Sequence, residues 1–178
     1  MTKSDVGLSA SRIQGTGGMG IAGCEIHLAP PQALPVPLRL WIPGLNIESN
    51  VVELGIEPDG ALQAPENGHD VGWYPQGARP GYCSNMVISG HLDWDRAPGV
   101  FWHLAELDPG DEVNVMAEDG VEHTYKVDWM RQYASKDVPL NQILGPTTDS
   151  LLTLITCGGG FAAPLVNISS VSSSGRTW

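Results

Sequence analysis

Short runs of alternating apolar and polar residues dominate the middle of the chain, and breaks rich in glycine and proline separate them. Leu38–Ile42 alternates as a half-buried strand does and ends at Pro43-Gly44. Ile47–Ile56 predicts a second extended segment, whereas 71–75 predicts the start of a short helix or a loop. Elements this short and closely spaced leave no room for regular helical crossovers. The pattern therefore predicts a mostly β domain, either a barrel or a sandwich.

Two continuous apolar runs predict strands that are buried on both faces. They are Asn85–Gly90 and Leu151–Thr156, of which the second is the more apolar. Between them, 101–107 predicts a turn or two of helix. The segment 111–132 predicts a hairpin around an acidic turn at 118–120. The two apolar runs are therefore expected to be the central strands of the domain.

The same pattern divides the chain into three parts. Residues 1–35 are polar, rich in glycine and without period, which predicts a flexible N-terminal arm. Residues 36–166 hold the strand pattern and predict one domain. Residues 167–178 are rich in serine and predict a loop or a disordered tail.

Composition and charge narrow the range of partners. Of 178 residues, 22 are glycine and 14 are proline, which agrees with many short strands and turns. Lys and Arg number 9 against 20 Asp and Glu, so the formal net charge is −11. Such a chain repels phosphate backbones and anionic lipid surfaces, which argues against nucleic-acid binding. No run of about 18 apolar residues predicts a membrane span, and no apolar core in residues 1–35 predicts a signal peptide.

The three cysteines, Cys24, Cys83 and Cys157, have no C-x-x-C spacing. This excludes zinc-ribbon and thioredoxin-like sites, and no H-x-x-x-H or carboxylate–histidine cluster indicates another metal site. We therefore expect neither a metal nor a cofactor. Because the number of cysteines is odd, at least one thiol stays free unless it pairs between molecules. The sequence leaves open whether Cys24 pairs with Cys83.

Cys157 is the strongest candidate for a nucleophile. It ends the most apolar run and precedes three glycines, which let a substrate backbone approach closely. Of the five histidines, His91 is singled out because it follows the other apolar run directly. If the two strands are parallel neighbours, both residues reach one rim, where a Cys–His pair gives a thiolate nucleophile and an imidazolium acid. The alternatives are a buried core cysteine and a loop histidine that caps a turn.

Four motifs, in order, resemble the sortases, which are the cysteine transpeptidases of Gram-positive cell surfaces. Thr153–Cys157 resembles the TLxTC signature of the family, and Val87–His91 resembles its strand-and-histidine segment. The stretch 101–113 resembles the family's linking segment, and 71–74 with Pro80-Gly81 resembles the segment before the histidine. The resemblance extends from about residue 38 to residue 160 and is strongest to the small actinobacterial-type sortases.

The resemblance implies a closed sortase-like β-barrel of about seven to eight strands with one or two short helices. It implies that Cys157 attacks the Thr–Gly bond of an LPxTG-like sorting signal and forms a thioacyl enzyme, while His91 protonates the leaving amine. An amine of a peptidoglycan precursor or of a pilin lysine then resolves the thioacyl enzyme. By the same resemblance the protein acts outside the cytoplasm, at the cell surface.

The chain departs from the family pattern in two places. Sortases carry an arginine about a dozen residues after the cysteine, whereas the only arginine downstream of Cys157 is Arg176. A shifted reading frame or a degraded C-terminus would explain this difference. The usual N-terminal membrane anchor is also not seen in the sequence. The alternative function is therefore a catalytically impaired barrel that binds sorting-type peptides without efficient turnover.

Overall fold

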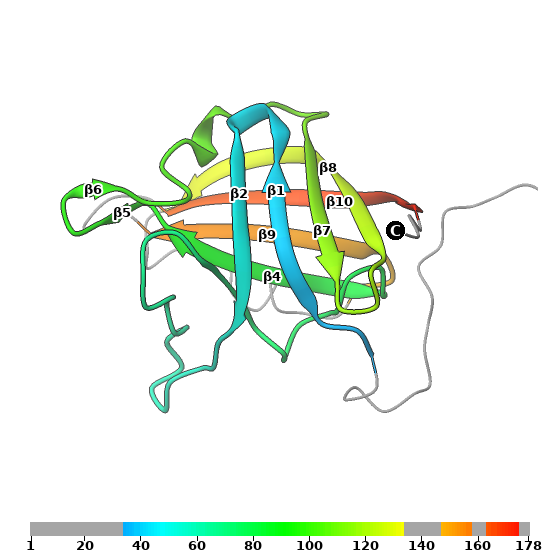
Figure 1. Ribbon diagram of the computed structural model, residues 1–178, viewed down its shortest axis with the longest axis horizontal. Helices are drawn as coiled ribbons and strands as arrows, with labels where there is room; N and C mark the ends of the chain where they lie inside the picture. The colour runs from blue at the N-terminus through cyan, green and yellow to red at the C-terminus, as the bar shows by residue number, and fades with distance from the viewer. Residues whose placement is uncertain (1–33, 134–146, 158–162, 175–178) are drawn as a thin grey trace, which may run out of the picture.

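A computed structural model describes residues 34–133, 147–157 and 163–174. Eight strands of the described residues close into a barrel (Figure 1). Around the barrel the strands follow the order β1 (Pro37–Ile42), β2 (Ile47–Glu53), β3 (Val71–Trp73), β4 (Ser84–His91), β9 (Ser150–Cys157), β10 (Ala163–Ser174), β8 (Glu122–Tyr133) and β7 (Glu112–Ala117). The mostly β fold class and the closed barrel predicted from the sequence are therefore confirmed.

The smaller elements are not strands of the barrel. β5 (Asp93–Trp94) and β6 (Ala97–Pro98) form a short hairpin directly after β4. The helical elements of the described residues are two single 3₁₀ turns, η2 (Pro43–Leu45) and η3 (Leu104–Glu106). The turn or two of helix predicted over 101–107 is thus reduced to η3. No helix in the described part of the chain is long and apolar enough to cross a membrane.

Most neighbouring strands of the barrel are antiparallel. The two parallel pairs are β2 with β3 and β4 with β9. β4 and β9 are the two apolar runs identified in the sequence, and parallel strands covered on both faces favour such continuous apolar segments. The predicted hairpin is also present as β7 and β8.

Two groups of apolar side chains cover the two faces of the central strands. The barrel interior holds the large core, whose fully buried members include Leu40, Ile42, Trp73, Met86, Ile88, Phe101, Leu104, Tyr125, Leu152 and Leu154. A smaller cluster of Tyr74, Val87 and Ile155 lies apart from it, with Leu54 and Leu62 packed against it. Because successive side chains of a strand point to opposite faces, Val87 and Ile155 belong to the outer face of the barrel.

Two predictions about secondary structure are corrected. Residues 71–73 form the short strand β3, where a helix or loop was expected. β10 continues to Ser174, beyond the expected boundary at residue 166 and through most of the serine-rich segment that was expected to be loop or disorder. β10 pairs with β8 as far as Ser174 and Glu122, and backbone hydrogen bonds of this kind need no apolar side chain. The predicted arm, except for residues 34–35, lies outside the described residues.

Candidate active site

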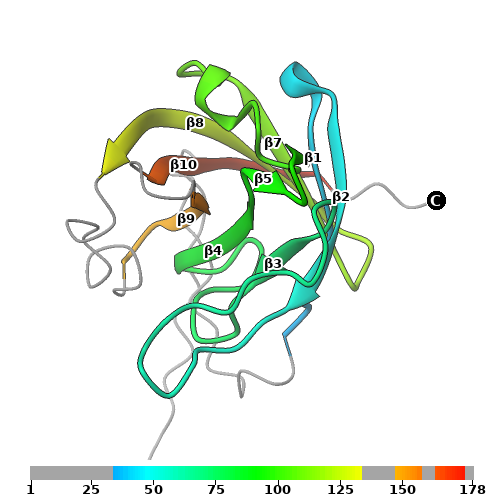
Figure 2. The same cartoon turned by 90° about the vertical axis from the view of Figure 1, so that its left-hand side faces the viewer.

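The two central parallel strands end side by side at His91 and Cys157. The register of β4 and β9 pairs Ser84 with Ser150 at one end and His91 with Cys157 at the other. We refer to these as the Ser84 end and the His91 end of the barrel, and Figure 2 views the molecule from the His91 end. Neighbouring strands lie about 4.8 Å apart, so the fold brings the backbones of these two residues together. The parallel adjacency on which the sequence prediction depended is therefore present.

The imidazole ring of His91 is held on two sides. Its Nε2 lies 2.8 Å from the backbone carbonyl oxygen of Pro65. A carbonyl can only accept a hydrogen bond, so Nε2 carries the proton and, in the neutral ring, Nδ1 is the basic nitrogen. The ring also packs against Trp94, with ring centroids 4.6 Å apart at an angle of 50°. These contacts fix both the orientation and the tautomer of a half-buried histidine.

The loop that carries Pro65 is held rigidly in place. The side-chain oxygen of Asn67 accepts hydrogen bonds from the backbone amides of His69 (2.9 Å) and Asp70 (2.8 Å). Its side-chain amide donates to the carboxylate of Asp70 at 2.8 Å. Gly68 then accepts a hydrogen bond from the amide of Val100 at 2.8 Å. The loop is therefore tied both to itself and to the segment after β6.

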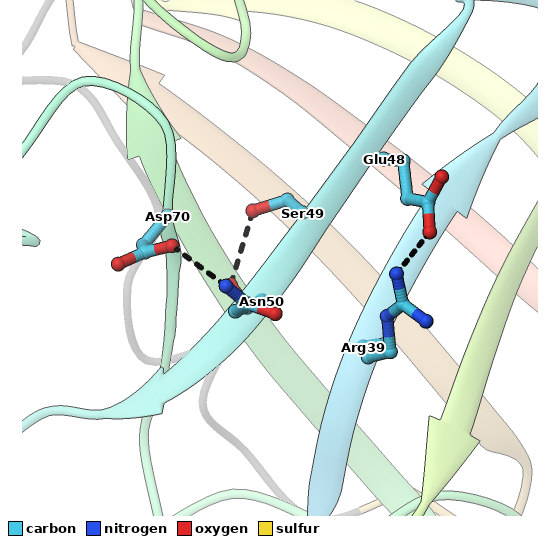
Figure 3. Close-up of polar contacts among 5 residues, drawn as sticks. All are labelled: Arg39, Glu48, Ser49, Asn50 and Asp70. Atoms are coloured by element: carbon cyan, nitrogen blue, oxygen red, sulfur yellow. Dashed lines mark hydrogen bonds and ion pairs between the residues drawn. The ribbon is translucent and has the colours of Figure 1, made fainter.

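Strand β2 anchors the C-terminal end of the same loop (Figure 3). The hydroxyl of Ser49 donates a hydrogen bond of 2.8 Å to the carbonyl of His69, and the side-chain amide of Asn50 lies 3.5 Å from the carboxylate of Asp70. Between β1 and β2, Arg39 forms an exposed ion pair with Glu48. The position of the Pro65 carbonyl thus depends on the barrel wall and not on the loop alone.

Close backbone packing brings the segment after β6 against His91. Gly99 approaches so closely that a Cβ there would lie 2.3 Å from the carbonyl oxygen of His91 and 2.9 Å from its Cβ. That carbonyl accepts a hydrogen bond of 2.9 Å from the amide of Phe101, whose ring is fully buried. Gly68 fits against Trp94 in the same way, since a Cβ there would lie 2.6 Å from the Trp94 Cβ. Glycines are required at both positions to seat the histidine.

Side chains on the outer face of the barrel pack next to the site. Tyr74 is buried, and its hydroxyl contacts the carbonyl of Gln63 at 2.6 Å and the hydroxyl of Ser89 at 2.7 Å. Ser89 lies two residues before His91 on β4, so both side chains point to the same face of the strand and the two hydroxyls neighbour the histidine. Val87 and Ile155 of the small outer cluster continue this face away from the His91 end.

A family model and several solved structures match this chain. The model of the sortase domain matches residues 40–167. The chain belongs to the sortase family. Among solved structures, it is similar to sortase A from Corynebacterium diphtheriae with 23% identity and a TM-score of 0.62, over 78% of this chain and 61% of that one. The match thus spans less than two thirds of that relative's length. Among curated proteins, no match to the sequence is found.

Other solved sortases share the fold at similar identity. Sortase C1 from Streptococcus agalactiae matches with 22% identity and a TM-score of 0.59, over 76% of this chain and 67% of that one. Sortase E1 from Streptomyces coelicolor, solved with a tripeptide in the active site, matches with 22% identity and a TM-score of 0.58, over 78% and 89%. The barrel is therefore a sortase fold.

The other described histidines of this sortase lie in different settings. His69 is exposed in the loop anchored by Asn67, and His103 lies 2.6 Å from Glu106 in an exposed pair. His123 lies at the Ser84 end, against Gly81, where a Cβ would be 2.4 Å from its Cε1. Burial lowers the pKa of His123, and the nearby charge of Asp119 opposes this shift. The fifth, His27, lies outside the described residues.

Sortases carry an arginine about a dozen residues after the cysteine, and the strand register shows where that position falls in this chain. In this chain that count reaches Ser169, which pairs with Leu151, near the Ser84 end. Ser170 pairs with Tyr125, also far from Cys157. The β10 positions near the His91 end are instead Ala163–Leu165, since Leu165 pairs with Ile155. None of the residues of β10 is an arginine, and Arg176 lies outside the described residues.

Sequence reasoning missed three parts of the site, Pro65, Trp94 and Gly99. Trp94 follows His91 by three residues, a spacing that could have drawn attention to it. The carbonyl of Pro65 left no signal in the sequence. Among the described residues, no group of three histidine, cysteine or acidic side chains is placed to hold a metal ion.

Proposed function

We propose that this sortase is a cysteine transpeptidase that cleaves an LPxTG-like sorting signal between threonine and glycine. The proposal rests chiefly on the register that pairs His91 with Cys157 at the ends of two parallel strands. Ile155 of the small outer cluster lies on the same strand, two residues before Cys157. Cys157 is the nucleophile in this proposal, and His91 is the acid and base.

The proposed chemistry is that of a cysteine thiol acting together with a histidine imidazole. Transfer of the thiol proton to Nδ1 of His91 gives a thiolate and an imidazolium, as expected for an activated cysteine. The thiolate attacks the threonine carbonyl carbon, and the C–N bond to glycine breaks as His91 returns the proton to the departing amine. A thioacyl enzyme remains, and His91, which has given up its proton, can now act as a base.

An amine acceptor completes the cycle. It attacks the thioester carbonyl and transfers a proton to His91, and a new amide bond forms as the thiolate of Cys157 leaves. The hydrogen bond from Nε2 to Pro65 keeps Nδ1 available for both proton transfers. The net charge of −11 favours an approaching ammonium group over an anionic acceptor. A peptidoglycan precursor or a pilin lysine outside the cytoplasm would supply such an amine.

One observation favours the alternative of an impaired enzyme. β10 is the strand beside β9, and no arginine occurs between Ala163 and Ser174. Loss of one donor to a developing oxyanion typically costs about 10²–10³-fold in rate. An impaired sortase would still form the thioacyl enzyme but would release it slowly.

Turnover of a labelled LPxTG-like peptide with an added amine tests the proposed function. The full chain and Cys157→Ala are incubated with peptide, with and without the amine, and the products are separated and counted per enzyme. Multiple turnovers to the amide product in the full chain alone support an efficient transpeptidase. A single burst of cleavage, equal to the enzyme present, supports the impaired alternative. Equal cleavage by Cys157→Ala would refute both.

A further inference from the structure

The carbonyl that accepts the proton of His91 belongs to the loop between β2 and β3. Nε2 of His91 lies 2.8 Å from the carbonyl oxygen of Pro65, and Pro65 is buried. The proline ring fixes φ of residue 65, but the direction of its carbonyl depends on ψ and so on the residues that follow. The contacts that hold residues 66–70 therefore decide whether this carbonyl meets the histidine.

Asn67 holds the backbone of that loop with a single side chain. Its Oδ1 accepts hydrogen bonds from the amides of His69 at 2.9 Å and Asp70 at 2.8 Å, which closes the turn from residue 67 to residue 70. Its Nδ2 donates to Oδ2 of Asp70 at 2.8 Å. Both ends of one side-chain amide are thus used within the loop that carries Pro65.

Asp70 joins the same turn to the barrel wall. Its Oδ1 faces the side-chain amide of Asn50 on β2 at 3.5 Å, on the opposite side from Asn67 (Figure 3). The neighbouring carbonyl of His69 accepts a hydrogen bond of 2.8 Å from the hydroxyl of Ser49. Asp70 also directly precedes β3, which pairs with β4, the strand that ends at His91. The turn is therefore fixed relative to the strand that carries the histidine.

We infer that Asn67 and Asp70 form a positioning pair for His91. Through the carbonyl of Pro65, the pair holds the imidazole with its Nε2 proton engaged, so that Nδ1 is the nitrogen that exchanges a proton with the substrate. Neither side chain of the pair takes part in the chemistry itself. The importance of the pair for catalysis rests on the proposed function, whereas its effect on the ring of His91 does not.

Exchanging the two side chains tests the pair. Asn67→Asp keeps an acceptor for the two backbone amides but places a second carboxylate against Asp70, and two carboxylates this close repel each other. The double variant Asn67→Asp/Asp70→Asn restores one donor and one carboxylate with the same net charge and the hydrogen bond reversed. Asn67→Ala, which adds no charge, is measured alongside.

Single-turnover cleavage of a labelled LPxTG-like peptide gives the effect on rate. Asn67→Asp and Asn67→Ala should lower the maximal rate of thioacyl formation by about 10- to 10²-fold, because the histidine is displaced. The half-saturating peptide concentration should change by less than about twofold, since the pair does not bind the peptide. The double variant should recover to within about threefold of the full chain.

Nuclear magnetic resonance of the ring proton gives a readout that needs no activity. The spectra are taken at about pH 8, where histidine is ordinarily neutral, in chains that carry Cys157→Ala and ¹⁵N-labelled histidine. The proton on Nε2 of His91, assigned by its loss in His91→Ala, should exchange slowly with water because it is hydrogen-bonded to a buried residue. Asn67→Asp and Asn67→Ala should speed this exchange by about tenfold or more, and the double variant should restore it.

Asn114→Ala is the matched control for a lost asparagine hydrogen bond. Asn114 accepts a hydrogen bond of 2.8 Å from Thr124 between β7 and β8, and β7 lies opposite β4 in the barrel order. It should change neither the cleavage rate nor the ring-proton exchange. Thermal unfolding shows that each variant is folded under the conditions used.

The two readouts separate the possible failures. Unchanged ring-proton exchange in Asn67→Asp and Asn67→Ala would overturn the inference. A double variant as impaired as Asn67→Asp would overturn it equally. Exchange that changes and recovers as expected, together with no thioacyl formation even in the full chain, would support the positioning pair and refute the proposed function instead.

Discussion

The two ends of the β4–β9 strand pair differ in the burial and the hydrogen bonding of their side chains. At the Ser84 end, Tyr125 is fully buried and its hydroxyl accepts a hydrogen bond of 3.1 Å from the amide of Gly81. At the His91 end, Trp94 is 41% exposed and packs against the ring of His91. Nε2 of that ring is hydrogen-bonded to the carbonyl of Pro65, and Nδ1 lies on the other side of the ring. The same two strands thus have one end that is closed by a buried side chain and one end that carries the proposed active site.

The two histidines at these ends lie in settings that suit different roles. Burial at the Ser84 end favours neutral His123, which lowers its pKa. His91 is held by a carbonyl and an aromatic ring, which fix its orientation and leave Nδ1 for chemistry. A histidine suited to proton transfer needs a fixed orientation together with an unoccupied nitrogen. Only the second histidine has that combination.

The largest contrast is expected between alanine variants of these two histidines. His91→Ala should lower the rate of thioacyl formation by about 10²–10⁴-fold, because proton transfer to the leaving amine is lost. His123→Ala should change that rate by less than about threefold, since it lies at the Ser84 end. Single-turnover cleavage of a labelled peptide measures both. A larger loss in His123→Ala would reverse the assignment of the two ends.

Arginines introduced at the two ends of β10 should have unequal effects. Leu165→Arg places a cation at the register position beside Ile155, near the His91 end, and Ser169→Arg places one on the same face beside Leu151, near the Ser84 end. We expect the first to raise the single-turnover rate by up to about 10²-fold, as a donor to the developing oxyanion. The second serves as the matched control and should leave the rate unchanged. Equal rates in both variants would show that the missing arginine does not limit this enzyme.

A single methyl group should disturb the His91 end. In Gly99→Ala the new Cβ would meet the carbonyl oxygen of His91 at 2.3 Å, so the histidine must shift. A displacement of about 1 Å at a catalytic group costs up to about 10²-fold in rate, and we expect at least a tenfold loss of kcat. Gly44→Ala is the control, because its Cβ would meet only Asp111 at 4.0 Å. Full activity in Gly99→Ala would mean that His91 need not be held so closely.

The smallest effect concerns stability against pH at the Ser84 end. The pKa of His123 is lower in the folded than in the unfolded state, so the unfolded chain takes up a proton first as the pH falls through about 6.5. The free energy of unfolding should therefore decrease between pH 7.5 and lower pH, down to the folded-state pKa. Urea unfolding of the full chain and of His123→Gln across this range should show a shallower decrease in the variant. Parallel curves would remove His123 as the cause.

Periodicity was sufficient to predict the main strands but not the weakest ones. The apolar runs at 85–90 and 151–156 and the hairpin at 111–132 carry strong local patterns, and the structure has strands at all of them. β3 has only three residues with Gly72 at its centre, and its pairing with β2 and β4 decides its conformation. β10 is rich in serine, and its neighbours β8 and β9 supply the hydrogen bonds that define it.

The candidate site could be predicted only as far as the two residues proposed to be catalytic. His91 and Cys157 were singled out because each follows an apolar run, and their pairing needed only that the two runs be parallel neighbours. The Pro65 carbonyl is a group that every residue has, and only the path of the loop selects it. Gly99 was not predicted for the same reason, since its role depends on a close backbone approach between segments.

The central claim is that the His91 end carries the nucleophile, and trapping the acyl group tests it most directly. The full chain is mixed with an LPxTG-like peptide without amine, quenched in acid and analysed by intact mass and tandem mass spectrometry. The account predicts one adduct, equal in mass to the peptide up to threonine, attached to Cys157 and not formed by Cys157→Ala. An adduct on any other residue, or peptide cleavage by Cys157→Ala, would contradict it.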